Sequence, residues 1–496
     1  MRHRTTRTVR HASATALVAA LLAVSACGGS AISAEKAVRA NAGVQGQGAA
    51  VAGAGSGPGA VTGGTGTTTG GTGTTTGGGT GTGATGGGTS TGGGSTTGGG
   101  TTTGGGTAAP ATGKGVRAGS CDGFKNSLGI TDDRIIIGNI ADVSGPVPGI
   151  FTSAQQATKA YAAYFNSTSA ICGRKLEVKS YDSQTNTSAD AVATQKTCDE
   201  TFAAVGSMGA FDSGGTAIAK KCNLPEMHAI ITNDDRAGCA TCFGASAPSD
   251  GLFPSAIPNY FTRTNKAATQ KAAMVYVNAA ASVGAAKAQI NAEQRRGWKF
   301  AFTGSFDIAE FNYGPLVQRM KSTGVKLVQM YGSSDMAVRM AKAMQSANFK
   351  PEIFLLPATQ YDKIYAAGGS PVDGSVVFVN FAPLEEARSN PELALYTQWL
   401  QQVSPGAEAT YFGLYAWSAA RLFSERATAL GGKLNRANLV QEFRKVRKWT
   451  SNGLHAPQAV GNKGGSDCVR FIQLRGGKWS PYGPTRYSCD GLVSAR

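Results

Sequence analysis

The chain has 496 residues, enough for two or three domains, but 69 of them are glycine and most of the excess lies before residue 110. Lysine and arginine total 47 against 30 aspartate and glutamate, a formal charge of +17. These cations are scattered and are not interleaved with aromatic residues. The composition therefore argues against a nucleic-acid groove and favours attraction to an anionic envelope or membrane surface.

The N-terminus has the order of parts of a bacterial export signal. Arginines up to Arg10 precede an apolar run over 14–24 that is too short to span a bilayer. The run ends in Val24-Ser-Ala-Cys27-Gly28, which resembles the lipobox of bacterial lipoproteins; the alternative is a plain secretory signal with a chance cysteine. The resemblance implies a signal peptide over residues 1–26, cleavage before Cys27 and a diacylglycerol on that cysteine. We expect a protein exported to the bacterial cell envelope and lipid-anchored to the outer face of the cytoplasmic membrane.

Residues 27–118 are predicted to be a disordered linker. Residues 28 to about 118 contain no Phe, Trp or Tyr, and their middle is a Gly/Thr tract. Such a segment buries too little apolar surface to offset its ordering entropy. Gly81-Thr-Gly-Ala-Thr-Gly86 matches the dinucleotide-binding fingerprint, but no strand is expected before it and no helix after it, so the match follows from composition.

Cysteine usage agrees with export. Besides Cys27 the chain has eight cysteines, an even number that suits disulfides in an oxidising compartment. The sequence alone does not determine the pairing. We expect a local structural bridge for the Cys-Ala-Thr-Cys segment, because it lies in a predicted loop, and we expect no metal site and no cofactor. The pairs that we favour are Cys198–Cys222, Cys468–Cys489, Cys121–Cys172 and Cys239–Cys242.

The folded part begins with 135–140, a β-branched apolar run typical of a strand buried on both faces of a parallel sheet. A loop at Ser144-Gly145 and an Ala-rich helical pattern over 151–165 follow. The next predicted elements are a strand at 175–181, a helix at 187–201 capped by Thr187 or Ser188, a strand at 202–208, a helix at 216–221 and a strand at 226–232. The carboxyl ends of parallel strands share one edge, so polar residues from several loops should gather there.

A second α/β series follows an irregular, Pro-containing crossing at 253–264. Strands are predicted at 272–278, 299–303, 325–331, 353–356 and 375–381, the last as a second crossing, and helices at 285–296, 311–323, 335–348, 391–403, 412–430 and 439–446. Residues 469–482 have the pattern of a β-hairpin that turns at Gly476-Gly477. This order implies an α/β fold of two lobes joined by several strands.

The sequence contains no nucleophile elbow, HExxH motif, P-loop or Ser/His/Asp set, so we expect no enzyme. Beyond the signal the histidines are His228 and His455. His228 lies in an apolar strand, where a core role is the simpler interpretation.

A series of short motifs between residues 135 and 385 resembles a known family. It comprises Ile135-Ile-Ile-Gly138 with Val143-Ser-Gly-Pro146, Gly173–Val178 with Tyr181-Asp182, Val205–Met208, Asn348–Pro351, Tyr361-Asp362, Ala367–Gly369, Asp373-Gly374 and Ala382–Glu385. In order and spacing these resemble the type I periplasmic-binding-protein superfamily, and more narrowly the substrate-binding lipoproteins of branched-chain amino acid (Leu/Ile/Val-type) ABC importers. The resemblance implies a domain over 119–490 with two Rossmann-like lobes joined by hinge strands. One lobe is expected over about 130–255 and 382–440, the other over about 256–381 and 441–490.

The resemblance also implies a ligand site between the lobes. Carried over to this sequence, its residues are Ser144, Gly145, Phe151, Phe211, Asp212, Ser213, Asn233, Asp234, Tyr331, Gln360, Tyr361 and Phe412.

One departure from the family pattern bears on the ligand. Amino-acid binders place a carboxylate for the ligand's ammonium just after the proline that ends the strand equivalent to 353–356. Here Pro357 is followed by Ala358-Thr-Gln360, and a poorly paired buried ammonium costs a few kcal/mol. Either Asp212 or Asp234 substitutes, or the ligand is an amide, a carboxylate or a polyol.

The expected function is extracytoplasmic capture of a small polar ligand, such as an amino acid, amide or related compound, and its delivery to an ABC importer permease. The alternative is a ligand-sensing receptor or surface-binding lipoprotein of the same fold without transport. We expect a monomer that does not bind nucleic acid.

Overall fold

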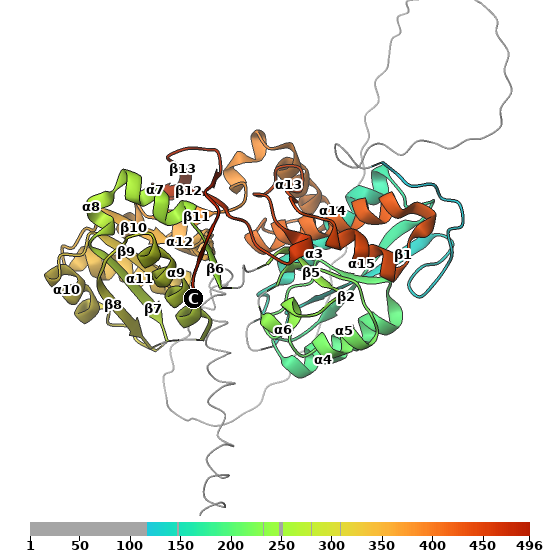
Figure 1. The fold of residues 1–496 in the computed structure, drawn as a ribbon, viewed down its shortest axis with the longest axis horizontal. Helices are drawn as coiled ribbons and strands as arrows, with labels where there is room; N and C mark the ends of the chain where they lie inside the picture. Colours follow the sequence, from blue (N-terminus) through green and yellow to red (C-terminus); the bar gives the residue numbers. More distant parts are fainter. Residues whose placement is uncertain (1–116, 146–147, 232, 248–250, 279, 308) are drawn as a thin grey trace, which may run out of the picture. The chain divides into compact units, whose positions relative to one another are not determined.

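The structure, a computed structural model, describes residues 117–145, 148–231, 233–247, 251–278, 280–307 and 309–496. The predicted signal peptide, the predicted lipidation site Cys27 and nearly all of the predicted linker lie outside these residues. The described chain is built on two main sheets, each with its own helices, which we call the first half and the second half (Figure 1). Within the described ranges, no helix has both the length and the apolar character needed to cross a bilayer.

The first half contains a five-stranded parallel sheet in the order β2-β1-β3-β4-β5. Its strands are β1 Arg134–Ala141, β2 Lys175–Asp182, β3 Ala203–Val205, β4 Glu226–Ile230 and β5 Cys242–Ser246. The connecting helices are α3 Thr152–Thr168, α4 Thr187–Glu200, α5 Thr216–Lys221 and α6 Asp234–Ala237. Every residue of the central strands β3 and β4 is buried, as expected for a sheet covered on both faces.

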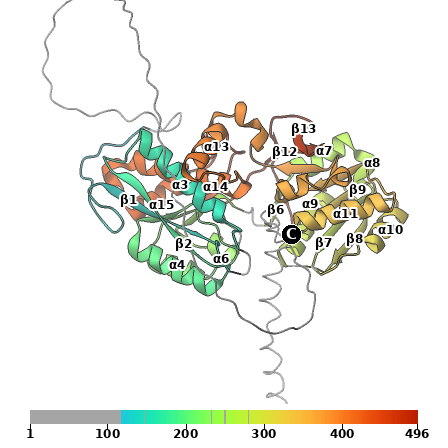
Figure 2. The same cartoon turned by 180° about the vertical axis from the view of Figure 1, so that it is seen from behind.

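Helices from late in the chain complete the first half. α13 Pro391–Val403 packs on α3, and α14 Tyr411–Leu430 packs on α3, β4 and β5. Figures 1 and 2 show these orange and red helices beside the cyan α3 in both views. α14 begins at Thr410, whose hydroxyl accepts a hydrogen bond from the N–H of Gly413, and most of the helix is buried. It is therefore the central helix of the first half's core.

The second half contains an eight-stranded sheet in the order β13-β12-β11-β10-β9-β7-β8, with β14 paired to β12. Its parallel strands are β7 Ala272–Val277, β8 Phe300–Phe306, β9 Leu327–Tyr331, β10 Ile353–Leu356 and β11 Val376–Val379. The antiparallel strands are β12 Cys468–Arg475, β13 Lys478–Tyr482 and β14 Ser488–Cys489. A separate pair joins β6 Leu252–Pro254 to β15 Leu492–Ser494.

The helices of the second half lie between these strands. They are α7 Ala256–Thr264, α8 Lys266–Thr269, α9 Ala280–Arg295, α10 Gly314–Ser322, α11 Ser334–Ser346 and α12 Lys363–Ala366. The short 3-10 turns of the described chain are η1 Ala358–Gln360, η2 Ser370–Val372, η3 Leu384–Arg388, η4 Gly431–Lys433 and η5 Val460–Asn462, and the last α-helix is α15 Arg436–Arg444.

The chain passes between the two sheets three times. It leaves the first sheet after β5, returns after β11 through η3 to α13, and leaves again after η5 to form β12. The predicted α/β fold with two Rossmann-like lobes joined by several segments is confirmed by this topology. The hairpin predicted at Gly476-Gly477 is also present, with both glycines at positive φ.

Two predictions for local structure were wrong. The segment that contains Cys239–Cys242 was predicted to be a loop, yet Cys242 begins β5. Parallel pairing with β4 and packing of Phe243 on Phe443 stabilise this strand, although its Gly/Ala/Ser sequence has weak β propensity. Residues 253–264 were expected to be irregular, yet they form β6 and then α7, whose buried stripe includes Ile257 and Phe261. Pro258 lies in the first turn of α7, where the missing N–H has no helical partner to lose.

Two boundaries also differ from expectation. α4 is capped by Asn186 rather than by Thr187 or Ser188, and the Asn186 side-chain oxygen accepts from the N–H groups of Ser188 and Ala189. Residues 441–463 were expected in the second lobe, but α15 and η5 contact the first half, where the Lys463 ammonium donates to the Ala237 carbonyl at 2.9 Å. The other lobe boundaries stay predictions.

The structure contains the four disulfides that were favoured from the sequence. They are Cys121–Cys172, Cys198–Cys222, Cys239–Cys242 and Cys468–Cys489. Cys239 and Cys242 are fully buried, which agrees with a structural rather than a redox bridge.

Candidate functional site

A carboxylate at the end of β1 joins three loops at the carboxyl edge of the first sheet. Asp142 accepts hydrogen bonds from the Ser183 hydroxyl at 2.6 Å, the Thr185 N–H at 2.9 Å and the Ala210 N–H at 2.8 Å. Burial raises the pKa of Asp142, while these three donors oppose the rise. Sequence reasoning missed this residue, although an aspartate directly after a buried strand was the available signal.

Ser144 and Gly145, both predicted ligand residues, lie in the exposed loop that follows. The Ser144 hydroxyl donates to Asp182 Oδ2 at 2.5 Å, and Asp182 also accepts from the N–H groups of Val143 and Gln184. Although burial acts against it, these hydrogen bonds lower the pKa of Asp182. Gly145 has φ +97°, and a Cβ there would lie 2.1 Å from the Gln184 carbonyl oxygen, so only glycine fits.

Asp212 lies in a buried charged cluster of the first half. It is 2% exposed, contacts the Asn233 amide, and lies 3.9 Å from both Arg236 Nε and His228 Nδ1. Its charge is therefore already opposed by groups of the protein. Asp234, the other candidate partner for a ligand ammonium, is exposed in the first turn of α6.

Arg236 is the centre of this cluster, which we call the Arg236 cluster: Asp190, Asp212, Glu226, His228 and Arg236. The fully buried Arg236 guanidinium donates to Glu226 at 2.9 and 3.0 Å and to Asp190 at 3.3 Å. Burial raises the pKa of Asp190 to about 7, with Arg236 opposing the rise. Burial also acts to raise the pKa of Glu226, but Arg236 and His228 hold it below its ordinary value. Glu226 is thus the carboxylate that stays ionised opposite Arg236.

Two further predicted residues form one aromatic contact. Phe151 and Phe412 pack edge to face with ring centroids 4.9 Å apart, and both are at least nine-tenths buried. A hydrogen bond of 2.9 Å between the Thr410 and Ser153 hydroxyls joins the same two helices, α3 and α14. These phenylalanines contribute to the core, and their contact with a ligand stays a prediction. Phe211 and Ser213 lie half-buried in the loop after β3.

In the second half, Gln360 and Tyr361 close the carboxyl ends of β9 and β10. Gln360 is 1% exposed; its amide donates to the Gly332 carbonyl at 2.8 Å and accepts from the Thr359 hydroxyl at 3.0 Å. The Tyr361 hydroxyl donates to Glu385 at 2.6 Å and accepts from the Leu384 N–H at 2.6 Å. Tyr361 therefore joins η1 to the second crossing, a link that the sequence did not indicate.

Tyr331 rests on a buried network around a carboxyl group. Its hydroxyl donates to Gln289 at 2.6 Å, and the amides of Gln289 and Gln329 donate to the two oxygens of Glu293 at 2.8 and 2.7 Å. Burial raises the pKa of Glu293 to about 8, and the hydrogen-bond partners of this carboxyl group in the described chain are the neutral amides of Gln289 and Gln329. We call these four residues the Glu293 network.

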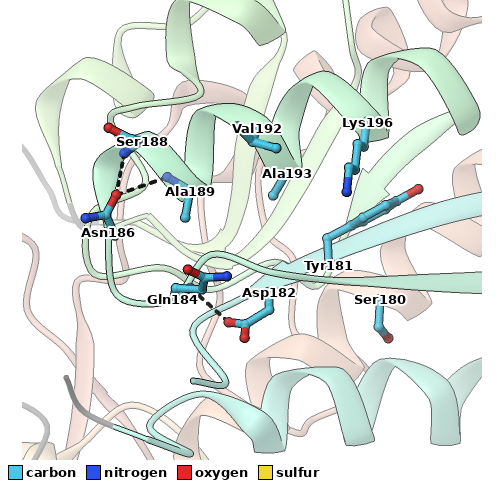
Figure 3. Close-up of a pocket in the computed structure, with 10 residues that line it drawn as sticks. All are labelled: Ser180, Tyr181, Asp182, Gln184, Asn186, Ser188, Ala189, Val192, Ala193 and Lys196. Carbon is cyan, nitrogen blue, oxygen red and sulfur yellow. Dashed lines mark hydrogen bonds between the residues drawn. The ribbon is translucent and has the colours of Figure 1, made fainter. Parts of the chain in front are cut away.

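A cavity of about 210 Å³ borders Tyr361, and a larger groove of about 660 Å³ lies between β2 and α4. Figure 3 shows Tyr181 and Lys196 on the walls of this groove, and the Asn186 side-chain oxygen accepting hydrogen bonds from the N–H groups of Ser188 and Ala189. None of the twelve predicted ligand residues lines the groove.

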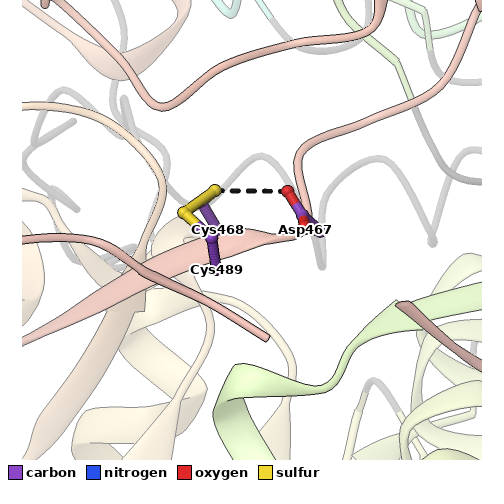
Figure 4. A group of neighbouring side chains, drawn as sticks. All are labelled: Asp467, Cys468 and Cys489. Carbon is purple, nitrogen blue, oxygen red and sulfur yellow. Dashed lines mark hydrogen bonds between the residues drawn. A yellow bond between two sulfur atoms is a disulfide. The ribbon is translucent and has the colours of Figure 1, made fainter. Parts of the chain in front are cut away.

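Three metal-type donors gather at Asp467, Cys468 and Cys489. Figure 4 shows that the two sulfur atoms form a disulfide, with Cys468 Sγ 3.2 Å from an Asp467 oxygen. Because neither sulfur is a free thiolate, this group is not suited to hold a metal.

In the first half the structure connects two pairs of predicted residues, Asp212 with Asn233 and Phe151 with Phe412, and it joins Ser144 to Asp182. The hydrogen bonds of Ser144 and Gln360 stay within their own halves. The ligand role of the twelve residues stays a prediction.

Comparison with known proteins gives the family. A family model described as periplasmic binding protein matches residues 134–478. No curated protein matches the chain in a sequence search. One similar solved structure is LivJ of Streptococcus pneumoniae in complex with isoleucine, with 14% identity, coverage of 73% of this chain and 99% of that chain, and a TM-score of 0.56. A second is a fatty acid ABC transporter substrate-binding protein from Thermomonospora curvata, with 17% identity, coverage of 73% and 94%, and a TM-score of 0.57. A third is an ABC transporter solute-binding protein from R. palustris in complex with 4-hydroxybenzoate, with 16% identity, coverage of 71% and 96%, and a TM-score of 0.56.

At these identities the solved structures support the fold alone, whereas the family model covers more than half of the chain and includes strands of both sheets. The chain therefore belongs to the periplasmic binding protein family.

Proposed function

We propose that the protein is an extracytoplasmic solute-binding protein that holds a small ligand between the carboxyl-end loops of its two halves and delivers it to an ABC importer. The observation that carries this proposal is the match of the family model from β1 to the first residue of β13, across both sheets and all three crossings between them. A fold of two lobes joined by several segments can close on a ligand by bending at those segments. The protein acts by binding, not by catalysis.

The same proposal includes the lipid anchor at Cys27 and the monomeric state. The order of basic residues, short apolar run, small residues and cysteine supports the anchor. A protein anchored in this way stays close to a membrane-embedded importer.

Free α-amino acids are disfavoured as ligands. Residues 358–360, directly after Pro357, include no carboxylate, and Asp212 already lies 3.9 Å from Arg236 Nε. An ammonium buried without an ionised partner is costly. Two proteins of similar fold were solved in complex with isoleucine and with 4-hydroxybenzoate, and a third is the substrate-binding protein of a fatty acid ABC transporter. The fold by itself therefore does not select a ligand.

A thermal-shift screen of the processed protein tests the proposal. The panel contains amino acids, amides, short peptides, sugars, carboxylates and organic amines. A true ligand at about 100 times its Kd should stabilise the folded state by about 2.7 kcal/mol. We expect a shift with one class and none with leucine; a micromolar leucine Kd would contradict the ligand argument. Stimulation of importer ATPase activity by the loaded protein separates delivery from sensing, and turnover of any ligand would contradict a pure binding role.

A further inference from the structure

The cavity that borders Tyr361 has an aromatic wall. Its volume is about 210 Å³, and Tyr361, Tyr411 and Trp479 all line it. Tyr361 and Trp479 are 7% and 8% exposed, and their ring centroids lie 5.6 Å apart at 54°. Phe381 supports the wall from behind, since it contacts both Tyr361 and Tyr411 at 5.5 and 5.2 Å. Three electron-rich rings from η1, α14 and β13 thus surround one small space.

The polar part of the lining is acidic. Glu385 and Glu408 line the cavity, and both carboxylates are exposed. Glu385 accepts from the Tyr361 hydroxyl through one oxygen, which fixes the carboxylate beside the aromatic wall. The cation in the lining, Lys363, pairs with Glu408 at 2.5 Å.

A third carboxylate, Asp362, adds to this charge, although its oxygens already accept from the Ser334 hydroxyl and the Tyr365 N–H. Counting Lys363 against the three acidic residues leaves the lining with a net negative charge of two. A ligand anion would therefore meet net repulsion, which the pairing of Lys363 with Glu408 does not relieve.

We propose that this cavity binds an organic cation, an amine or quaternary ammonium compound with an apolar body. This inference rests on the proposed solute-binding function and names its ligand class. A cation over aromatic faces gains about 0.5–2 kcal/mol per favourable contact, and most when it is desolvated. The carboxylates supply the opposite charge that residues 358–360 lack, while the cation of the lining, Lys363, pairs with Glu408. The cavity thus selects amines over amino acids and carboxylic acids.

The test is calorimetric titration of the processed full-length protein with choline, phenethylamine, isoleucine and 4-hydroxybenzoate. The uncharged isostere of choline, 3,3-dimethyl-1-butanol, is the matched probe, because it differs from choline in charge but not in shape. We expect at least one cation to bind, and choline to bind at least about tenfold more tightly than its isostere.

Variants then locate the site. Glu385→Gln with Glu408→Gln removes two charges and keeps the Tyr361 hydrogen bond, and should weaken cation binding about tenfold or more. Trp479→Phe keeps an aromatic core residue whose ring attracts a cation less strongly, and should weaken cation binding several-fold. Glu352→Gln is the control: it removes an exposed carboxylate that pairs with Lys326 and does not line the cavity. This control should leave the cation affinity unchanged.

The outcomes are distinct. Cation binding that both cavity variants leave unchanged overturns the location. No binding of any cation at 10 mM, with tight binding of another solute class, overturns the ligand class and leaves the solute-binding function standing. No binding of any solute in the whole panel overturns the function as well.

Discussion

The two halves share a fold plan but bury their acidic groups in opposite ways. In the first half, the Arg236 cluster places three carboxyl groups around one guanidinium and one imidazole. In the second half, the Glu293 network surrounds one carboxyl group with amides and a phenol and includes no cation. Each cluster includes one candidate ligand residue: Asp212, in the loop after β3, belongs to the first, and Tyr331, the last residue of β9, belongs to the second.

The difference teaches how each half tolerates a buried acid. An ionised carboxylate in the interior needs an opposite charge and hydrogen bonds, which Arg236 supplies to Glu226. Without a cation the cheaper solution is to keep the proton, and burial raises the pKa of Glu293 to about 8. The first half is therefore held by charge pairing and the second by a neutral hydrogen-bond network, so substitution and pH should affect them differently.

Removal of Arg236 should have the largest effect. Arg236→Met leaves Glu226, Asp190 and Asp212 buried without their main cation, which should cost about 3–5 kcal/mol of unfolding free energy. Urea unfolding followed by circular dichroism measures the loss. The control, Arg263→Met, breaks a pair whose arginine side chain is 61% exposed, and should cost no more than about 1 kcal/mol. A loss below about 1 kcal/mol for Arg236→Met would contradict the assigned role.

Glu293→Gln should have a smaller effect of opposite sign. The folded protein keeps the Glu293 proton up to a pKa of about 8, whereas the unfolded chain releases it near pH 4.5, so this group lowers stability as pH rises between those values. The amide cannot ionise, so the variant should gain on the order of 4 kcal/mol relative to the wild type at pH 8. Melting curves at pH 5 and pH 8 measure this, and the advantage should nearly vanish at pH 5. A stability gain of the variant that does not grow with pH would disprove that Glu293 is protonated in the folded protein.

The smallest effects should come from the loops at the two sheet edges. Ser144→Ala removes a hydrogen bond to the Asp182 carboxylate and should cost about 1 kcal/mol, because bonds to charged acceptors are the stronger ones. Thr359→Ala removes a bond to the neutral Gln360 amide and should cost about half as much or less. Both values come from thermal unfolding. Equal losses of stability in the two variants would contradict the expectation that the hydrogen bond to the charged Asp182 is stronger than the one to the neutral Gln360.

Much of the fold was predictable because it depends on local pattern. The apolar run at 135–140 and the boundaries of α5 and β10 follow from burial on both faces and from flanking Gly and Pro residues. β5 was missed because its five residues, Cys-Phe-Gly-Ala-Ser, have weak β propensity and are held by β4 and α15. The cap of α4 was displaced by one residue because several neighbouring polar side chains compete for that position.

The candidate site divides along the same line. The local sequence pattern was enough to indicate the loops after the strands that carry Ser144, Asp212, Asn233 and Gln360, and the missing carboxylate directly after Pro357. The packed structure was needed to establish the four cysteine pairs, the three loops that Asp142 joins, the contact of Arg236 with Asp190, 46 residues earlier, and the contact of Tyr361 with Glu385 beside Trp479. The physical reason is that a local pattern specifies which face of an element is buried, whereas the charge and hydrogen-bond partners of a buried side chain depend on how distant segments pack together.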